Sequence, residues 1–308
     1  MSACAAFQLP FKAFAARADT PTAWSGNTGN IRLISPFAAG GGTDFIARAI
    51  AEEVRKLTDV TAYVENKPGA SGTIANNLLL NAAADGKTNL IGSVDTQIIS
   101  PLIRGEIEKY TPIVPVLGLA EAPYLLAAPR AKDLTLEAVL KRGQKSELNI
   151  ATAGEGTVTS VLAKLFEKHV GGRINIIPYN GSGPAGMALL SSVVDVAWVN
   201  TAFAKAQQDH LHLLATASPT TLEDFPSVPT LSSLGIDVQG SSWIGWFCPP
   251  GLPMETSAQL ADVLMKAKES AAFENTVKTA GMKALRQNQR DFQDFCKHEI
   301  ARWRTALV

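Results

Sequence analysis

The sequence predicts an α/β protein of two lobes, each lobe a mostly parallel sheet flanked by helices. Short apolar runs alternate with amphipathic stretches along most of the 308 residues, and this alternation is typical of parallel sheets covered on both faces. It is interrupted at 113–128, where two apolar runs follow one another without a helix, and the apolar run 242–248 comes late in the chain. We interpret these runs as strands that cross from one lobe to the other and back.

The first predicted unit is a strand, a glycine loop and a helix. The strand is Ile31–Ser35, and apolar residues recur at helical spacing between 46 and 57. Between them lie Gly40-Gly41-Gly42 and Thr43, which we expect to be the helix N-cap. Uncovered amides at a helix N-terminus favour an anion. The alternative is a structural turn with Phe37 packed in the core.

The later units repeat this pattern. The predicted elements are, in chain order: strand 60–64, a helix that stops at 85–86, strand 89–92, helix 97–102, strands 113–118 and 124–128, helix 135–141, strand 148–151, a helix from 158 that ends at 171–172, strand 174–179, a helix opened by Pro184, strands 195–199, 211–217 and 242–248, and helices 257–270, 273–279 and 291–303. We expect the last three helices to pack on the first lobe through Leu260, Leu264, Phe292, Phe295 and Trp303.

Composition narrows the classes of function. Lys+Arg and Asp+Glu both number 28, so the chain has no overall charge with which to attract nucleic acid or an anionic membrane. No apolar run reaches the length of about 18 residues that a transmembrane helix needs. With 46% hydrophobic residues the chain can bury the cores of two domains.

The N-terminal segment 1–28 is predicted to lie outside the fold. Ala16-Arg17-Ala18 before Asp19 has the small-x-small spacing of a signal-peptidase site, so we interpret the segment as an export-signal remnant followed by a linker. We place the first lobe at 29–121 and 244–308 and the second at 122–243. Cys248 and Cys296 either pair in an oxidising compartment or remain buried free thiols.

The predicted loops contain the groups of a binding site rather than those of an enzyme. They carry hydroxyls, amides, one Tyr and one Phe at the carboxyl ends of strands, where α/β sheets bind ligands. No G-x-S-x-G occurs, and none of the four histidines lies in a glycine loop. We therefore expect no catalytic residues, no metal site and no cofactor.

One motif favours a different class of protein. Gly181-Ser182-Gly183-Pro184-Ala185-Gly186 matches G-x-G-x-x-G between a strand and a helix, which is the dinucleotide-binding pattern. The next strand ends at Val199-Asn200, without the carboxylate that would bind a ribose hydroxyl. A nicotinamide-dependent oxidoreductase therefore stays as an alternative to a binding protein.

Seven motifs together resemble those of the periplasmic solute receptors of tripartite tricarboxylate transporters, the Bug family. They occur in the family's order and cover nearly everything from Ile31 onward: P-F-A-A-G-G-G-T-D at 36–44, V-E-N-K-P-G-A-S-G at 64–72, A-D-G-K-T at 84–88, A-T-A-G-E-G-T at 151–157, P-Y-N-G-S-G-P-A at 178–185, D-F-P-S-V-P-T at 224–230 and S-S-W-I-G-W-F at 241–247.

The resemblance implies a two-lobed, type II periplasmic-binding-protein-like fold with two crossover strands. It implies a monomer that captures a small carboxylate between its lobes, in the periplasm, and delivers it to the permease subunits of a tripartite transporter. A sensory receptor without a permease is a further alternative. The residues that it implies for ligand binding are Phe37, Ala38, Gly41, Thr43, Asp44, Thr96, Ala153, Gly156, Thr157, Tyr179, Ser182, Asn200 and Thr201.

Two departures from the family pattern bear on the ligand. Val199-Asn200 stands where family members often have Asp-Asn, and Asn180 stands where they often have Lys. The first departure removes an acceptor that could hold an amino group. We therefore expect a plain di- or tricarboxylate rather than an amino acid.

Overall fold

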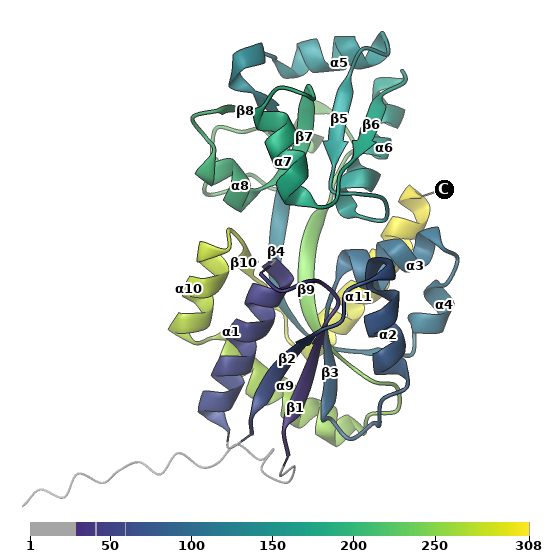
Figure 1. Ribbon diagram of the computed structural model, residues 1–308, viewed down its shortest axis with the longest axis vertical. Helices are drawn as coiled ribbons and strands as arrows, with labels where there is room; N and C mark the ends of the chain where they lie inside the picture. The colour runs from purple at the N-terminus through teal and green to yellow at the C-terminus, as the bar shows by residue number, and fades with distance from the viewer. Residues whose placement is uncertain (1–28, 41, 59, 308) are drawn as a thin grey trace, which may run out of the picture.

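The computed structural model of the protein describes residues 29–40, 42–58 and 60–307. Its ribbon shows two lobes, one above the other, joined by the long strands β4 and β9 (Figure 1). The first part of the described chain and its C-terminal helices form the lower lobe, and the middle of the chain forms the upper lobe. The predicted export-signal segment 1–28, which contains the third cysteine of the chain, Cys4, lies outside the described residues.

The lower lobe, called lobe I below, is built from both ends of the described chain. Its elements are β1 (Ile31–Ser35), α1 (Gly42–Leu57), β2 (Ala62–Asn66), η1 (Ala70–Gly72), α2 (Thr73–Leu80), β3 (Thr88–Ser93), η2 (Asp95–Ile99), α3 (Ser100–Ile103), α4 (Ile107–Tyr110), the first half of β4 (Val114–Pro129), β9 (Ser241–Cys248), α9 (Met254–Lys268), α10 (Ala271–Thr279), β10 (Lys283–Ala284) and α11 (Gln289–Ala306).

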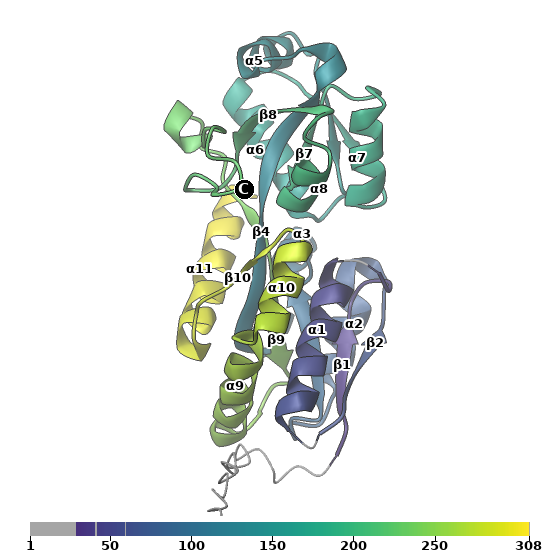
Figure 2. The same cartoon turned by 90° about the vertical axis from the view of Figure 1, so that its left-hand side faces the viewer.

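The upper lobe, lobe II, is built from the middle of the chain. Its elements are the second half of β4, η3 (Arg130–Lys132), α5 (Leu136–Gln144), β5 (Asn149–Thr152), α6 (Val158–Val170), β6 (Asn175–Pro178), α7 (Ser182–Leu190), β7 (Val196–Asn200), α8 (Thr201–Ala206), β8 (Leu211–Thr216) and η4 (Ser232–Leu234). Figure 2 shows α7 and α8 on one side of this lobe and α6 farther back.

Each lobe contains a parallel group of three strands next to the crossing strands. In lobe I the group is β2-β1-β3, and in lobe II it is β7-β5-β6. The crossing strands β4 and β9 pair antiparallel with these groups and with each other. The sheets are therefore mixed, because a chain that leaves a lobe and later returns runs in opposite directions on its two crossings.

The structure corrects the prediction of two separate strands at 113–118 and 124–128. A single strand, β4, runs through both segments from Val114 to Pro129. The residues between them pair with β9, for example Ala120 with Ile244 and Glu121 with Trp243. β4 pairs with β9 as far as Pro123 and with β7 from Tyr124 onward, so the strand changes partners where it enters lobe II.

The helices after β9 cover lobe I as the sequence predicted. Leu260, Leu264, Phe292 and Trp303 are fully buried, and Phe295 is half-buried. The rings of Trp243 and Phe292 meet edge to face, with centroids 5.8 Å apart. These rings belong to an apolar cluster that continues into α6 of lobe II, so one side of the molecule has a core that both lobes share.

The two cysteines in the described part of the chain do not form a disulfide bond. Cys248 and Cys296 are buried free thiols.

The predicted helix 97–102 is present as the π-helical turn η2, which is followed directly by α3. Within the described ranges, no helix combines the length and the apolar character that crossing a membrane requires.

Candidate ligand-binding site between the lobes

The predicted site residues lie on loops and helix starts at the carboxyl ends of strands in both lobes. Gly41 lies outside the described residues. The others are distributed as follows: Phe37, Ala38, Thr43 and Asp44 after β1; Thr96 after β3; Ala153, Gly156 and Thr157 after β5; Tyr179 and Ser182 after β6; Asn200 and Thr201 at the end of β7.

Loops of opposite lobes touch each other at two places. At the first, the carboxylate Oδ1 of Asp95 accepts a hydrogen bond of 2.8 Å from the backbone amide of Val158, and Gly156 lies beside Ser100. At the second, the hydroxyl of Thr201 donates to the carbonyl oxygen of Gly281. The two groups of loops are therefore brought together rather than scattered.

Asp44 organises the loop after β1. Its carboxylate is buried and accepts hydrogen bonds from Arg48 at 2.9 and 3.1 Å, from Asn66 at 2.8 Å and from the Gly40 amide at 3.0 Å. Burial alone would raise the pKa of Asp44, but these bonds and the Arg48 charge bring it below its usual value. The side chain is thus an anchor for the loop whose bonds are satisfied within the protein.

Two residues of lobe I differ from their predicted roles. Thr43 is not the N-cap of α1, because the helix already begins at Gly42 and includes Thr43 in its first turn. Thr96 is 1% exposed, and its hydroxyl accepts a hydrogen bond of 3.0 Å from the Ser93 amide. In this structure the Thr96 side chain supports the loop from within and does not face the space between the lobes.

The loop after β5 is held by bonds within itself. Thr157 is the N-cap of α6, and its hydroxyl donates to the Gly154 carbonyl at 2.7 Å. The Ala153 amide donates to the Thr159 hydroxyl at 2.8 Å. Gly154 and Gly156 have φ angles of 121° and 75°, a region that favours glycine. The sequence A-T-A-G-E-G-T therefore encodes a fixed loop shape.

Three helices of lobe II begin at these loops, and α7 is the one whose first turn has no side-chain cap. α6 begins with the Thr157 cap and α8 with the Asn200 cap, whose Oδ1 accepts from the Phe203 amide at 2.9 Å. α7 begins at Ser182 after the N-cap residue Gly181, and it has no side-chain cap. The Gly181 amide donates to the Ala153 carbonyl at 3.1 Å, so the amides left uncapped are those of Ser182 and Gly183. Uncapped amides at the positive end of a helix dipole suit a carboxylate.

The G-x-G-x-x-G motif at this helix has a packing explanation for its last glycine. A side chain at Gly186 would come within 2.5 Å of the Phe203 ring, so glycine lets α7 and α8 approach each other closely. β7, the next strand, ends at Asn200 and presents no carboxylate there. These features weaken the dinucleotide interpretation.

Asp95 is a further residue between the lobes that the sequence analysis did not single out. It lies two residues after the end of β3 and is only partly exposed, between the lobes, where it accepts a hydrogen bond from the first amide of α6. Burial raises its pKa to about 6. The available signal was its position, because an acidic residue just after an apolar strand lies at the edge of the sheet where ligands bind.

A comparison with known families covers almost the whole chain. The family described as tripartite tricarboxylate transporter family receptor, TctC, matches residues 46–308. The chain belongs to this family of receptors. Among its relatives is the protein BugT of Bordetella pertussis, which is 29% identical over 284 residues that cover 89% of this chain and 86% of BugT.

Solved structures resemble this receptor in fold. A TctC solute binding protein from Polaromonas is 25% identical with a TM-score of 0.77 and covers 91% of this chain and 98% of that chain. MatC from Rhodopseudomonas palustris, solved with bound malate, is 25% identical with a TM-score of 0.78, covering 91% and 99%. The periplasmic binding protein BugD is 26% identical with a TM-score of 0.76, covering 91% and 96%. The predicted two-lobed fold is confirmed.

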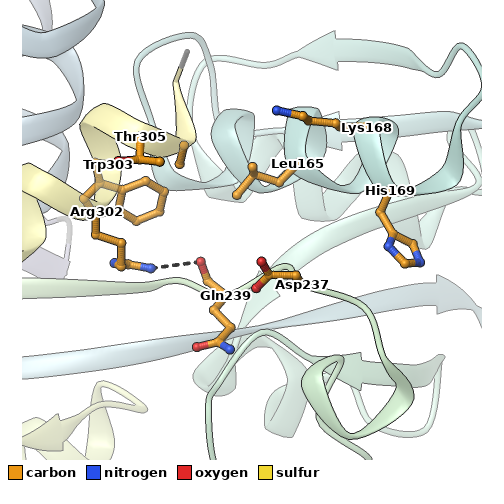
Figure 3. Close-up of a pocket in the computed structure, with 9 residues that line it drawn as sticks. Leu165, Lys168, His169, Asp237, Gln239, Arg302, Trp303 and Thr305 are labelled. Carbon is orange, nitrogen blue, oxygen red and sulfur yellow. Dashed lines mark hydrogen bonds between the residues drawn. The ribbon is translucent and has the colours of Figure 1, made fainter.

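The receptor also has a surface cavity of about 630 Å³ between α6 of lobe II and α11 of lobe I (Figure 3). Lys168 and His169 line it from α6. Arg302 lines it from α11 and donates a hydrogen bond of 3.1 Å to the Gln239 carbonyl. The residues that line it include none of the predicted site residues. In the described part of the chain, no three His, Cys, Asp or Glu side chains are grouped to hold a metal ion.

Proposed function

We propose that this receptor captures a small organic acid, a di- or tricarboxylate or a similar compound, between its lobes and delivers it to the membrane subunits of a tripartite transporter. The observation that carries the proposal is the uncapped start of α7, with the amides of Ser182 and Gly183, at the end of lobe II that faces lobe I (Figure 1). Backbone amides at that position can hold a carboxylate without any arginine.

The pairing of Asp44 with Arg48 is compatible with an anionic ligand that is held mainly by amides. Asp44 is already neutralised by Arg48 and does not repel an incoming anion as a free carboxylate would. Several charge-assisted hydrogen bonds, less the cost of ordering, leave room for an affinity of about 1 μM. The relative MatC, solved with bound malate, is consistent with a carboxylate.

The ligand contacts and the setting are part of the same proposal. We propose the residues after β1, β5, β6 and β7 as contacts, with Thr96 supporting the loop from behind, and we propose lobe boundaries at 121/122 and 243/244. The protein acts as a monomer in the periplasm. The family match supports these assignments and favours a receptor over the oxidoreductase alternative.

A thermal-shift screen of organic acids tests the proposal. We expect at least one di- or tricarboxylate to raise the melting temperature at millimolar concentration, because a ligand that binds only the folded state stabilises it. NADH serves as the comparison ligand and is expected to cause no shift. If NADH raises the melting temperature and every carboxylate fails, the oxidoreductase alternative replaces the receptor.

A further inference from the structure

The candidate site contains two acidic side chains whose surroundings differ. Asp44 accepts hydrogen bonds from a guanidinium, an amide side chain and a backbone amide. Asp95 accepts one hydrogen bond, from the Val158 amide at 2.8 Å. A carboxylate has about four lone-pair positions, so Asp95 keeps acceptor capacity that Asp44 has used.

Asp95 also lacks a positively charged neighbour among the described residues. None of the ion pairs of the described chain includes it, whereas Arg48 lies 2.9 Å from the Asp44 carboxylate. Buried charges in proteins are normally paired, because leaving water without a partner is costly. An unpaired, largely buried carboxylate at a binding site is therefore a candidate for a ligand contact.

The neighbours of Asp95 come from both lobes and from the crossing strands. Val158 begins α6 of lobe II, and Ser100 follows on the next turn after Asp95. Burial raises the pKa of the Tyr124 hydroxyl on β4, and the charge of nearby Asp95 raises it further. The same hydroxyl is hydrogen-bonded to Ser242 of β9. A group bound to Asp95 would therefore lie where the two lobes and both crossing strands meet.

We propose that Asp95 determines ligand specificity by accepting a hydrogen bond from an ammonium or hydroxyl group that the ligand carries beside its carboxylates. This inference rests on the proposed function and narrows its ligand class to hydroxy acids and amino acids. The absence of an acidic residue at Val199 favoured a plain carboxylate in the sequence, but Asp95 supplies the missing acceptor from the opposite lobe.

Isothermal titration with matched acids tests the inference. The probes are succinate, malate and aspartate, then glutarate, 2-hydroxyglutarate and glutamate, then tricarballylate and citrate, so that each series differs in the donor group alone. In the wild type we expect the acid with the donor to bind about tenfold or more tightly than its plain partner, because the bond to Asp95 is charge-assisted.

The Asp95→Asn variant removes the charge and keeps an oxygen that can accept from the Val158 amide. We expect it to reduce the preference for the donor-bearing acid to about threefold or less, mostly by weakening that acid. Asp294→Asn is the control, since it removes one negative charge from an exposed residue of α11 and should leave the preference unchanged.

The outcomes separate the two proposals. If a plain acid binds the wild type as tightly as its donor-bearing partner, or if Asp95→Asn changes both affinities by the same factor, the role of Asp95 is refuted while the receptor function stands. If none of the eight acids binds the wild type or the Asp294→Asn variant, the proposed ligand class is refuted and the specificity role with it.

Discussion

At the scale of single residues, Asp44 and Asp95 show how surroundings decide the behaviour of an acidic side chain. Both lie in segments that follow strands of lobe I, yet the pKa of Asp44 is lowered and that of Asp95 is raised to about 6. Burial raises the pKa of each, and only Asp44 has a guanidinium and several donors that outweigh burial. Their effects on stability should therefore depend on pH in opposite directions.

Arg48→Ala should destabilise the protein at neutral pH by about 1 kcal/mol, a discounted value because Arg48 itself is half exposed. The folded-state pKa of Asp44 is depressed, so its stabilising effect is present above the unfolded pKa of about 3.9 and is lost as the pH falls through the folded value. Urea unfolding from pH 7 to pH 3 should show the difference from wild type shrinking in acid.

Arg55→Ala is the control for this prediction. Arg55 lies on the same helix and pairs with Glu52, but both side chains are exposed, and such surface pairs contribute little. A loss of stability in Arg55→Ala that equals the loss in Arg48→Ala would contradict the anchoring role of Asp44.

Asp95→Asn should stabilise the folded protein at pH 8. The folded-state pKa of Asp95 is raised, because burial disfavours its charged form. Its contribution to folding stability is therefore fully present below the unfolded pKa of about 3.9, where the carboxyl group is protonated, and is lost as the pH rises through about 6. The variant has no charge to bury and should gain on the order of 2 kcal/mol over wild type at pH 8, with no gain near pH 4. Unfolding curves at the two pH values measure this, and an equal difference at both would contradict it.

At the scale of elements, Glu299 is one of the residues that attach α11 to the crossing strands. The Glu299 Oε2 accepts hydrogen bonds from the indole nitrogens of Trp243 on β9 and Trp303 on α11, each at 3.0 Å. Arg302 pairs with the same carboxylate at 2.7 Å. Both tryptophans are fully buried, so neither indole has access to water as a substitute partner.

Glu299→Ala should cost about 3 kcal/mol of unfolding free energy, because it leaves two buried indole N–H groups without an acceptor. Glu299→Gln keeps an acceptor oxygen and loses mainly the pairing with Arg302, so it should cost about 1 kcal/mol. Urea unfolding followed by circular dichroism compares the two. Equal losses would show that charge, and not the acceptor for the tryptophans, fixes α11.

The sequence predicted most elements because their patterns are local. The stripe from Val158 to Phe166 and the glycines after it define α6 without reference to any other part of the chain. β4 was divided in two because Glu121 and Pro123 interrupt its apolar run, and its continuity depends on pairing with β9, more than a hundred residues away.

The candidate site could be predicted as a set of loops, and less well as a set of contacts. The family motifs located the loops, but they did not show that the Thr96 hydroxyl is used by Ser93 within its own loop. Asp95 was missed because its significance comes from Val158, 63 positions later and in the other lobe. Contacts between lobes leave no periodic signal in a single sequence.

At the scale of the whole molecule, the relative position of the lobes is limited by close contacts. On one side, α11 packs on lobe II, where Trp303 of α11 and Leu162 of α6 both lie against Gly240. On another side, Thr201 and Ala202 of lobe II meet Gly281, between α10 and β10 of lobe I. Gly281 has φ 66°, and a methyl group there would overlap backbone atoms of Ala202.

Gly281→Ala should therefore push the lobes apart. Backbone atoms of Ala202 cannot rotate away as a flexible side chain could, so the strain is relieved by separating the lobes. We expect a larger radius of gyration in X-ray scattering and carboxylate binding weakened by about tenfold, because the arrangement that brings the loops together becomes less populated.

The matched control is Gly105→Ala. Gly105 has nearly the same backbone conformation, with φ 69°, but no atom lies within 4 Å of the added methyl group. Both variants should lose about 1 kcal/mol of stability from the strained backbone, while Gly105→Ala keeps the wild-type radius and affinity. If both variants bind the carboxylate equally well, contact at Gly281 does not govern how the lobes meet, and ligand binding must depend on the loops of each lobe separately.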